Sequence, residues 1–98
     1  MSTPRLEDLG KCRERIDQID RQILELLNQR TTIVEEIGRV KQALQMAVYE
    51  PKREDQVYAN VIGHNAGPLS SEAVRRIFER IIDEMRTVQR LKIVQKDG

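Results

Sequence analysis

Two cations interrupt an apolar stripe in the first half of the sequence, where the helical pattern otherwise calls for aliphatic residues. On a helical wheel of about 100° per residue, Lys41 and Arg30 fall within about 20° of Ile23 at the centre of that stripe. A buried cation must meet a carboxylate, a ligand or water. The two lie roughly 16 Å apart along a helix, which leaves space for a small anion between their side chains. The alternative is an internal ion pair, with Asp17, Asp20 or Glu54 as the candidate acids.

A buried amide repeats this anomaly near the end of the chain. Gln89 follows Ile82 by seven residues and Met85 by four, so it belongs to an apolar helical face. It either satisfies backbone groups or donates a hydrogen bond to a ligand oxygen. An anionic ligand would also suit an arginine, which contacts a carboxylate through two parallel hydrogen bonds. The residues that could add to such a site are Arg13 at the edge of the stripe, and Arg53 and Glu54.

The elements that must position these residues are helices. Apolar residues recur at three- and four-residue steps, no strand-like alternation competes with them, and no proline occurs between Pro4 and Pro51. We expect a first helix with Thr3 as its N-cap and Pro4 as its first residue. A second helix begins near Pro51 and stops at Gly63, and a third follows the N-cap Ser70. The sequence therefore predicts an all-α protein with three helices and one domain, residues 1–98. The mixed-sign residues of the third helix are expected on a solvated face: Arg75, Arg76, Glu79, Arg80, Asp83, Glu84 and Arg86.

The first helix is too long for one chain to cover. About 40 residues span roughly 60 Å, whereas a compact domain of this length has a radius of gyration of about 13 Å. We therefore expect an intertwined homodimer, in which a second copy buries the rest of the stripe. The alternative is a helix that breaks near Gly38 and folds back into an ordinary bundle.

Composition limits the function. Seventeen Lys and Arg against sixteen Asp and Glu give a net charge of +1, and aromatic residues make up 3%. Neither feature suits a nucleic-acid binder. Cys12 is the single cysteine and His64 the single histidine, so a Cys/His metal site cannot be assembled. No signal core or membrane span is apparent. We expect a cytoplasmic protein without metal or cofactor that binds neither nucleic acid nor membrane.

Four segments together resemble the all-helical chorismate mutases of the small, dimeric bacterial type. They are RERIDQIDRQILELLNQR at 13–30, GRVK at 38–41, VYEPKRE at 48–54 and RIFERIIDEMRTVQ at 76–89. Each segment is weak alone, but their order and spacing are specific, and the resemblance covers nearly the whole chain. It implies three helices per chain, intertwined first helices and two equivalent active sites in a homodimer.

The resemblance also implies a reaction, the rearrangement of chorismate to prephenate in phenylalanine and tyrosine biosynthesis, without a cofactor. Arg13 matches an arginine that reaches into the partner's site, and Arg30 one that binds a substrate carboxylate. Lys41 and Gln89 match the pair that contacts the ether oxygen. Glu54 matches the acid that accepts from the ring hydroxyl. Arg53 matches a nearby arginine of the site.

Two positions depart from the family pattern: Glu50 stands where Asp is expected, and Met85 where the bacterial type often has a substrate-contacting serine. Two other functions remain open. An isochorismate-pyruvate lyase shares this fold and much of the site, and a noncatalytic dimerisation or regulatory module would neutralise Arg30 and Lys41 internally. Some family members act beside other aromatic-pathway enzymes, so such an enzyme is a candidate partner.

Overall fold

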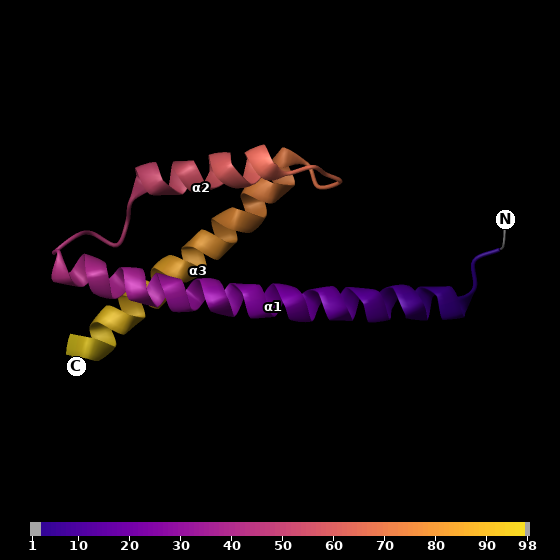
Figure 1. Ribbon diagram of the computed structural model, residues 1–98, viewed down its shortest axis with the longest axis horizontal. Coiled ribbons are helices and arrows are strands. Elements are labelled where there is room, and N and C mark those ends of the chain that lie inside the picture. The colour runs from indigo at the N-terminus through magenta and orange to yellow at the C-terminus, as the bar shows by residue number, and fades with distance from the viewer. Residues whose placement is uncertain (1–2, 98) are drawn as a thin grey trace. The chain divides into compact units, whose positions relative to one another are not determined.

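The computed structural model describes residues 3–97, with side chains described for residues 3–91. Three helices and their connections make up these residues: α1 (Leu6–Ala43), α2 (Pro51–His64) and α3 (Ser71–Asp97) (Figure 1). No strand occurs in this described part of the chain. The predicted all-α class with a very long first helix is confirmed, since α1 has 38 residues. None of the described helices is long and apolar enough to cross a membrane.

α1 begins at Leu6, two residues later than the predicted start at Pro4. The backbone N–H of Arg5 donates to the Asp8 carboxylate over 2.8 Å. This contact is half of a capping box, in which an acid three residues after the N-cap accepts from the N-cap amide. Arg5, rather than Thr3, therefore occupies the N-cap position.

The end of α1 is a tight backbone turn. The N–H of Met46 donates to the Lys41 carbonyl over 2.8 Å, and the N–H of Gln45 donates to the Gln42 carbonyl over 3.2 Å. These two bonds form a Schellman motif, whose middle residue adopts the left-handed conformation. Gln45 has φ of 58° and fills that position. Glycine is the usual residue there, so Gln45 stores a small backbone strain.

The ends of α2 and α3 follow local sequence signals closely. Pro51 lies in the first turn of α2, and the helix continues one residue past Gly63 to His64. Ser70 caps α3 as predicted, because its Oγ accepts from the N–H of Ala73 over 3.1 Å. The intervening turn is organised by the Asn65 side chain, which hydrogen-bonds within residues 65–69.

The chain forms two compact units that divide between Thr32 and Ile33. In the first unit, the described side chains are exposed apart from Leu27, Arg30 and Thr31, which are half-buried. The second unit contains the buried apolar side chains of the described chain, which are Val34, Tyr58, Val74, Ile82 and Met85.

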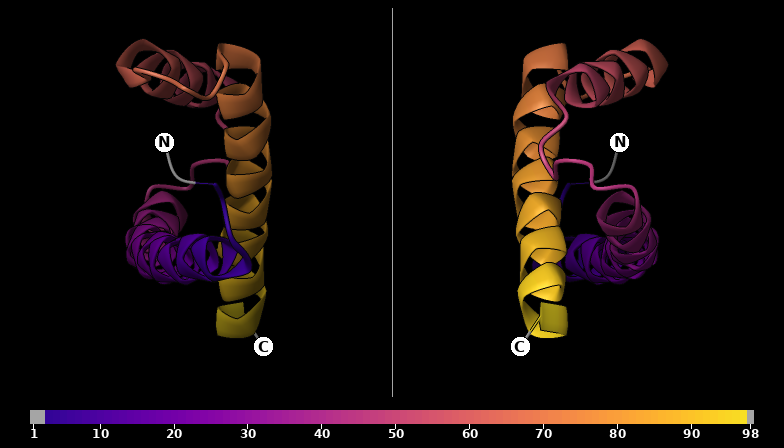
Figure 2. Two further views of the ribbon diagram at one scale, coloured as in Figure 1. Left: turned by 90° about the vertical axis from the view of Figure 1, so that its right-hand side faces the viewer. Right: turned by 90° about the vertical axis from the view of Figure 1, so that its left-hand side faces the viewer.

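Within the second unit, α2 meets α3 near the turn that joins them (Figure 2). The last part of α1 contacts α3 farther along, where Gln89 lies against Gly38 and Val34. A Cβ at position 38 would lie 3.4 Å from Gln89 Cγ, at the short end of ordinary van der Waals contact, so a Cβ fits there but a larger side chain would meet Gln89. Gly38 does not break α1, which continues to Ala43.

Candidate active site

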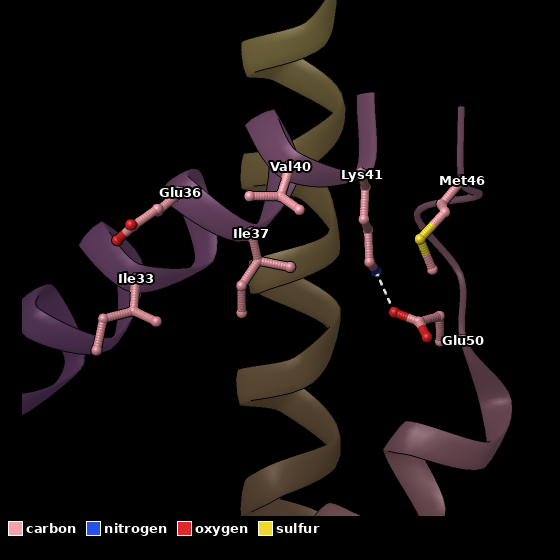
Figure 3. A pocket seen from close by; sticks show the side chains of 7 residues that line it. All are labelled: Ile33, Glu36, Ile37, Val40, Lys41, Met46 and Glu50. Atoms are coloured by element: carbon pink, nitrogen blue, oxygen red, sulfur yellow. Dashed lines mark ion pairs between the residues drawn. The ribbon is translucent and has the colours of Figure 1, made fainter. Parts of the chain in front are cut away.

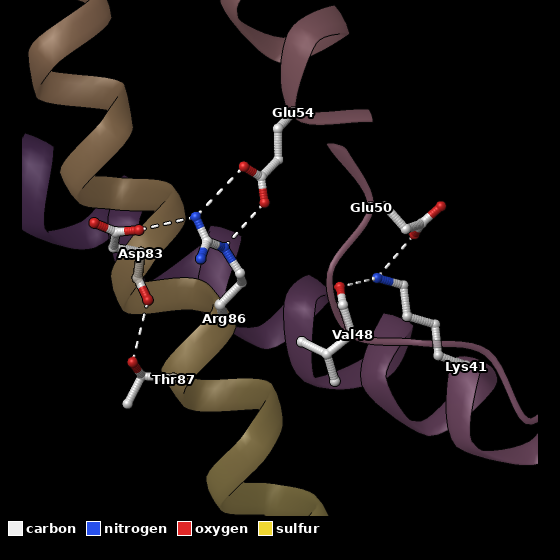
Figure 4. Close-up of polar contacts among 7 residues, drawn as sticks. All are labelled: Lys41, Val48, Glu50, Glu54, Asp83, Arg86 and Thr87. Atoms are coloured by element: carbon white, nitrogen blue, oxygen red, sulfur yellow. Dashed lines mark hydrogen bonds and ion pairs between the residues drawn. The ribbon is translucent and has the colours of Figure 1, made fainter. Parts of the chain in front are cut away.

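Lys41 is buried despite its charge, with 8% of the residue exposed. Its Nζ donates to the Val48 carbonyl over 2.8 Å and pairs with Glu50 Oε1 at 2.8 Å (Figure 4). The turn at Gln45 explains both contacts, because it ends α1 and lets the chain return past the Lys41 side chain. The acids proposed from the sequence as internal partners were wrong for Lys41, since Glu50 takes that place.

Gln89 is equally buried, with 7% exposed. Its Nε2 donates to the Val34 carbonyl over 3.3 Å, which is the backbone alternative predicted for this amide. A primary amide carries two N–H donors, and this contact uses one of them. This contact fixes the orientation of the Gln89 amide, whose nitrogen faces α1. Gly38 lies beside the methylene groups of the Gln89 side chain.

Glu54 is held by an arginine that the sequence analysis had placed on a solvated face. Arg86 Nε lies 2.9 Å from Glu54 Oε2, and Nη2 donates to Oε1 over 3.4 Å. Nη2 also donates to Asp83 over 2.9 Å. The side chains of Arg86 and Glu54 are only 27% and 17% exposed, so the prediction for Arg86 was wrong.

A helical wheel could have found Arg86. It follows Ile82 by four residues and precedes Gln89 by three, so all three share one face of α3. The neighbouring charges Arg80 and Glu84 do pair on the exposed surface. Arg86 stands in the same run of charges as Arg80 and Glu84 but lies on a different face of the helix.

The other expected residues of the second unit have different surroundings. Met85 is buried and belongs to the core. Arg53 is exposed, and its Nη1 donates to Gln56 over 3.3 Å. Glu50 and Glu54 are linked at the start of α2, where the N–H of Glu54 donates to the Glu50 carbonyl over 3.1 Å. One of these acids therefore pairs with α1 and the other with α3.

Arg13 and Arg30 belong to the first unit. Arg13 is exposed along its stretch of α1, and Arg30 is half-buried. Their predicted contacts with a ligand therefore remain predictions. The burial predicted for Lys41 and Gln89 is confirmed, whereas Arg30 is less buried than its position on the wheel indicated.

Tyr58 lies one helical turn after Glu54, and the pKa of its phenol is raised. Burial raises the pKa of its phenol above 10.0, and the nearby carboxylates of Glu79 and Glu54 act in the same direction. Arg75 opposes them, with its guanidinium 4.3 Å from the centroid of the ring. The protonated phenol is thus the form that the fold favours.

Lys41 and Glu50 also line a pocket of about 330 Å³ (Figure 3). Its remaining wall consists of Ile33, Glu36, Ile37, Val40 and Met46. This volume lies within the range of small-molecule sites. The wall carries one cation and two carboxylates, so a dianion bound there would need further cations. Among the described residues, no three His, Cys, Asp or Glu side chains gather so as to hold a metal ion.

The chain is similar to known proteins in sequence and in fold. The family model described as chorismate mutase type II matches residues 12–90. A bifunctional chorismate mutase/prephenate dehydratase of Neisseria gonorrhoeae is 41% identical over 78 residues, covering 80% of this chain and 21% of that protein. The corresponding bifunctional protein of Aquifex aeolicus is 32% identical over 81 residues, covering 79% of this chain and 22% of that protein. The chain thus spans about a fifth of the length of these two relatives.

A solved structure is also similar. The structure of chorismate mutase from Thermus thermophilus superimposes with a TM-score of 0.82 at 33% identity. The match covers 84% of this chain and 93% of the Thermus chain. The three-helix arrangement therefore matches a solved protein over most of its length.

Proposed function

The chain belongs to the chorismate mutase type II family, and from this membership we propose that it rearranges chorismate to prephenate. In this intramolecular reaction a carbon–oxygen bond breaks as a carbon–carbon bond forms, so no nucleophile or cofactor takes part. The protein's task is to hold the substrate in its reactive conformer and to stabilise the negative charge that grows on the ether oxygen.

The observation that carries the proposal is the buried, oriented ammonium of Lys41 at the pocket wall. An ammonium has three N–H donors, and the contacts with Val48 and Glu50 use two of them. The third is the donor that we assign to the ether oxygen. Because the surrounding contacts already fix Lys41, it needs little reorganisation when charge develops, and a preorganised donor of this kind contributes roughly 3 kcal/mol.

Gln89 is the second donor to the ether oxygen in this proposal. One N–H of its amide already holds the side chain against the Val34 carbonyl. The other is available for a hydrogen bond that strengthens in the transition state. Enzymes commonly lower a barrier by at least about 8 kcal/mol, so two donors must act together with substrate orientation.

The pocket charges support roles for the two arginines of the first unit. Chorismate is a dicarboxylate, and the pocket wall alone has one cation against two acids. We assign Arg30 to one substrate carboxylate and Arg13, supplied by the partner subunit, to the other. Both arginines would hold the compact conformer through paired hydrogen bonds.

Four further residues complete the proposed site. Glu54 accepts from the ring hydroxyl, and Glu50 orients Lys41 and lies beside the substrate. Arg53 is the neighbouring arginine of the site; in this structure its guanidinium is exposed and donates to Gln56. Met85 has a buried side chain, and in the proposed site it offers an apolar contact where the family often has a serine.

A homodimer is part of the proposal, and the exposed apolar side chains of the first unit support it. Ile16 and Ile23 are 56% and 48% exposed, and they share the apolar repeat along α1. A continuous apolar stripe of this kind marks an association surface. A second copy of the same helix, in a two-fold arrangement, would cover it and carry Arg13 to the neighbouring site.

The pathway context is proposed from the names of the relatives. Two of them join a chorismate mutase to a prephenate dehydratase in one protein. An enzyme that consumes prephenate is therefore the candidate partner of this chain. We propose the cytoplasm as its location, and we propose that residues 1–98 act as one mutase domain.

The activity is tested by following chorismate consumption with the purified chain and with Lys41→Ala. We expect the substitution to lower kcat by about 100- to 1,000-fold, as for loss of one oriented donor. Arg39→Ala is the matched control, because Arg39 is an exposed cation two residues earlier on α1. If Lys41→Ala turns over chorismate within tenfold of the unsubstituted protein, with both variants folded, Lys41 is not the donor to the ether oxygen.

The shared site is tested by mixing two inactive variants. Arg13→Ala and Arg30→Ala each spoil both sites of their own homodimer. After unfolding and refolding together in equal amounts, half of the dimers are mixed, and each mixed dimer has one intact site. We therefore expect about a quarter of the normal activity. No recovery, in a sample shown to contain mixed dimers, would contradict a site that uses Arg13 of the partner subunit.

A further inference from the structure

Arg86 holds the carboxylate of Glu54 from the side. The guanidinium approaches both carboxylate oxygens, with Nε 2.9 Å from Oε2 and Nη2 3.4 Å from Oε1 (Figure 4). Only Nη2 donates a hydrogen bond here; the buried Nε lies close to Oε2 as an ion pair, without a hydrogen bond. The charge contact and the one hydrogen bond together hold the Glu54 carboxylate in place. Arg53 does not share this task, because its Nη1 donates to Gln56 on the exposed surface.

The guanidinium is itself held by two other groups. Asp83, one turn earlier on α3, accepts from Nη2 over 2.9 Å. The ring of Tyr49, in the connection before α2, lies 5.4 Å from the guanidinium carbon. Arg86 thus joins α3 to the start of α2 and to the segment before it. An anchored cation of this kind can orient Glu54, whereas a mobile one could not.

The contact between Arg86 and Glu54 also balances charge at the proposed site. In the proposed function, Glu54 accepts a hydrogen bond from a substrate that carries two carboxylates. A carboxylate facing a dianion in a partly buried site is repelled, and the repulsion grows as water is excluded. Arg86 offsets that repulsion at a distance of 2.9 Å while leaving Glu54 able to accept the hydrogen bond.

We propose that Arg86 is a positioning residue for the mutase reaction, which sets the orientation of Glu54 and lets this acid face a dianionic substrate. The inference rests on the proposed function. It predicts that Arg86 acts on substrate binding through Glu54 and does not touch the substrate. Loss of Arg86 therefore weakens the binding of substrate and transition state together, which raises KM with little change in kcat.

The test compares Arg86→Met and Arg86→Lys, alone and combined with Glu54→Gln. We expect Arg86→Met to raise KM for chorismate about 10- to 100-fold, the range for loss of a charged hydrogen-bonding partner, with kcat within about threefold. Arg86→Lys keeps the charge without the fork and should recover part of the loss. In the Glu54→Gln background, Arg86→Met should change KM less than about threefold, because the two residues act as one unit.

The control is Arg75→Met, which removes a cation, an ion pair with Glu79 and an aromatic contact from the same helix. It should leave KM unchanged. A purely structural role for Arg86 would lower kcat at constant KM, or would give the same effect in both backgrounds, and either result overturns the inference. Should Arg86→Met not fold by circular dichroism, an unchanged KM in Arg86→Lys overturns it. Absence of chorismate conversion by the unsubstituted chain would instead refute the proposed function, and the inference would fall with it.

Discussion

Replacing Gln89 by Glu converts a permanent donor into one that depends on pH. The amide is buried at 7% exposure, and its Nε2 donates to the Val34 carbonyl over 3.3 Å. An ionised carboxylate at this position has no proton to donate, so two oxygens would face each other. The protonated acid would restore a donor. The variant Gln89→Glu should therefore fold best in acid.

The magnitude follows from these contacts. Leaving the Val34 carbonyl without its donor costs about 1–3 kcal/mol, and burial of the new charge adds to that cost. Because a shift of one pH unit corresponds to about 1.4 kcal/mol, a penalty of about 2 kcal/mol moves the new carboxyl from an ordinary pKa of about 4.3 to about 6. A folded-state pKa raised in this way gives stability that is complete below about pH 4.3 and falls as the pH rises through about 6.

The assay measures urea unfolding and kcat at about pH 5 and about pH 8, on either side of that value. About half of the 2 kcal/mol is already lost at about pH 5, which lies above the unfolded-state pKa of about 4.3. We therefore expect Gln89→Glu to lose a further ~1 kcal/mol of stability, and most of its turnover, between the two conditions. Gln89→Met, which cannot titrate, is the control and should show the same defect at both. Equal stability of Gln89→Glu at both values would refute the buried donor. If the stability of Gln89→Glu depends on pH but its kcat does not, Gln89 is not a donor in the reaction.

Three further predictions concern the fold. Gln45→Gly should raise the free energy of unfolding by about 0.5–1 kcal/mol, because it relieves a φ of 58°, and a less stable variant in urea would contradict the turn. Burial raises the pKa of Tyr58 above 10.0, so folded stability should fall as the pH rises past about 10. In Tyr58→Phe, the free energy of unfolding measured in urea should depend less on pH above about 10. The same pH dependence in the variant and the unsubstituted protein would contradict the raised pKa of Tyr58. Gly38→Val should cost about 1–3 kcal/mol in thermal unfolding, since even a Cβ would lie 3.4 Å from Gln89. Gly10→Val, where a Cβ meets nothing within 4 Å, should cost nothing, and equal effects of the two substitutions would refute the close approach.

Helical periodicity predicted most of the secondary structure, because it depends on local spacing. Ser70 marked the start of α3, and Pro51 marked the start of α2. The same periodicity predicted that Lys41 and Gln89 are buried although both are polar. The predicted start of α1 at Pro4 was wrong, because the Asp8 carboxylate accepts from the backbone N–H of Arg5 and sets the start two residues later.

The ion-pair partners were harder to predict than the helices. Glu50 pairs with Lys41 because of a turn at Gln45, and a helical wheel says nothing about the path of a connection. Arg86 was missed because it stands in a run of charges, although its spacing places it on the face of Gln89. The homodimer stays a prediction, supported by the exposure of Ile16 and Ile23.

The most direct test of the account identifies the product formed by the purified chain from chorismate, with a parallel incubation with isochorismate. The account predicts prephenate from chorismate, seen by nuclear magnetic resonance as a new carbon–carbon bond with no pyruvate released. It predicts that Lys41→Ala forms at least about 100-fold less prephenate under the same conditions. Pyruvate release from isochorismate without prephenate formation, or no conversion of either compound, would contradict it.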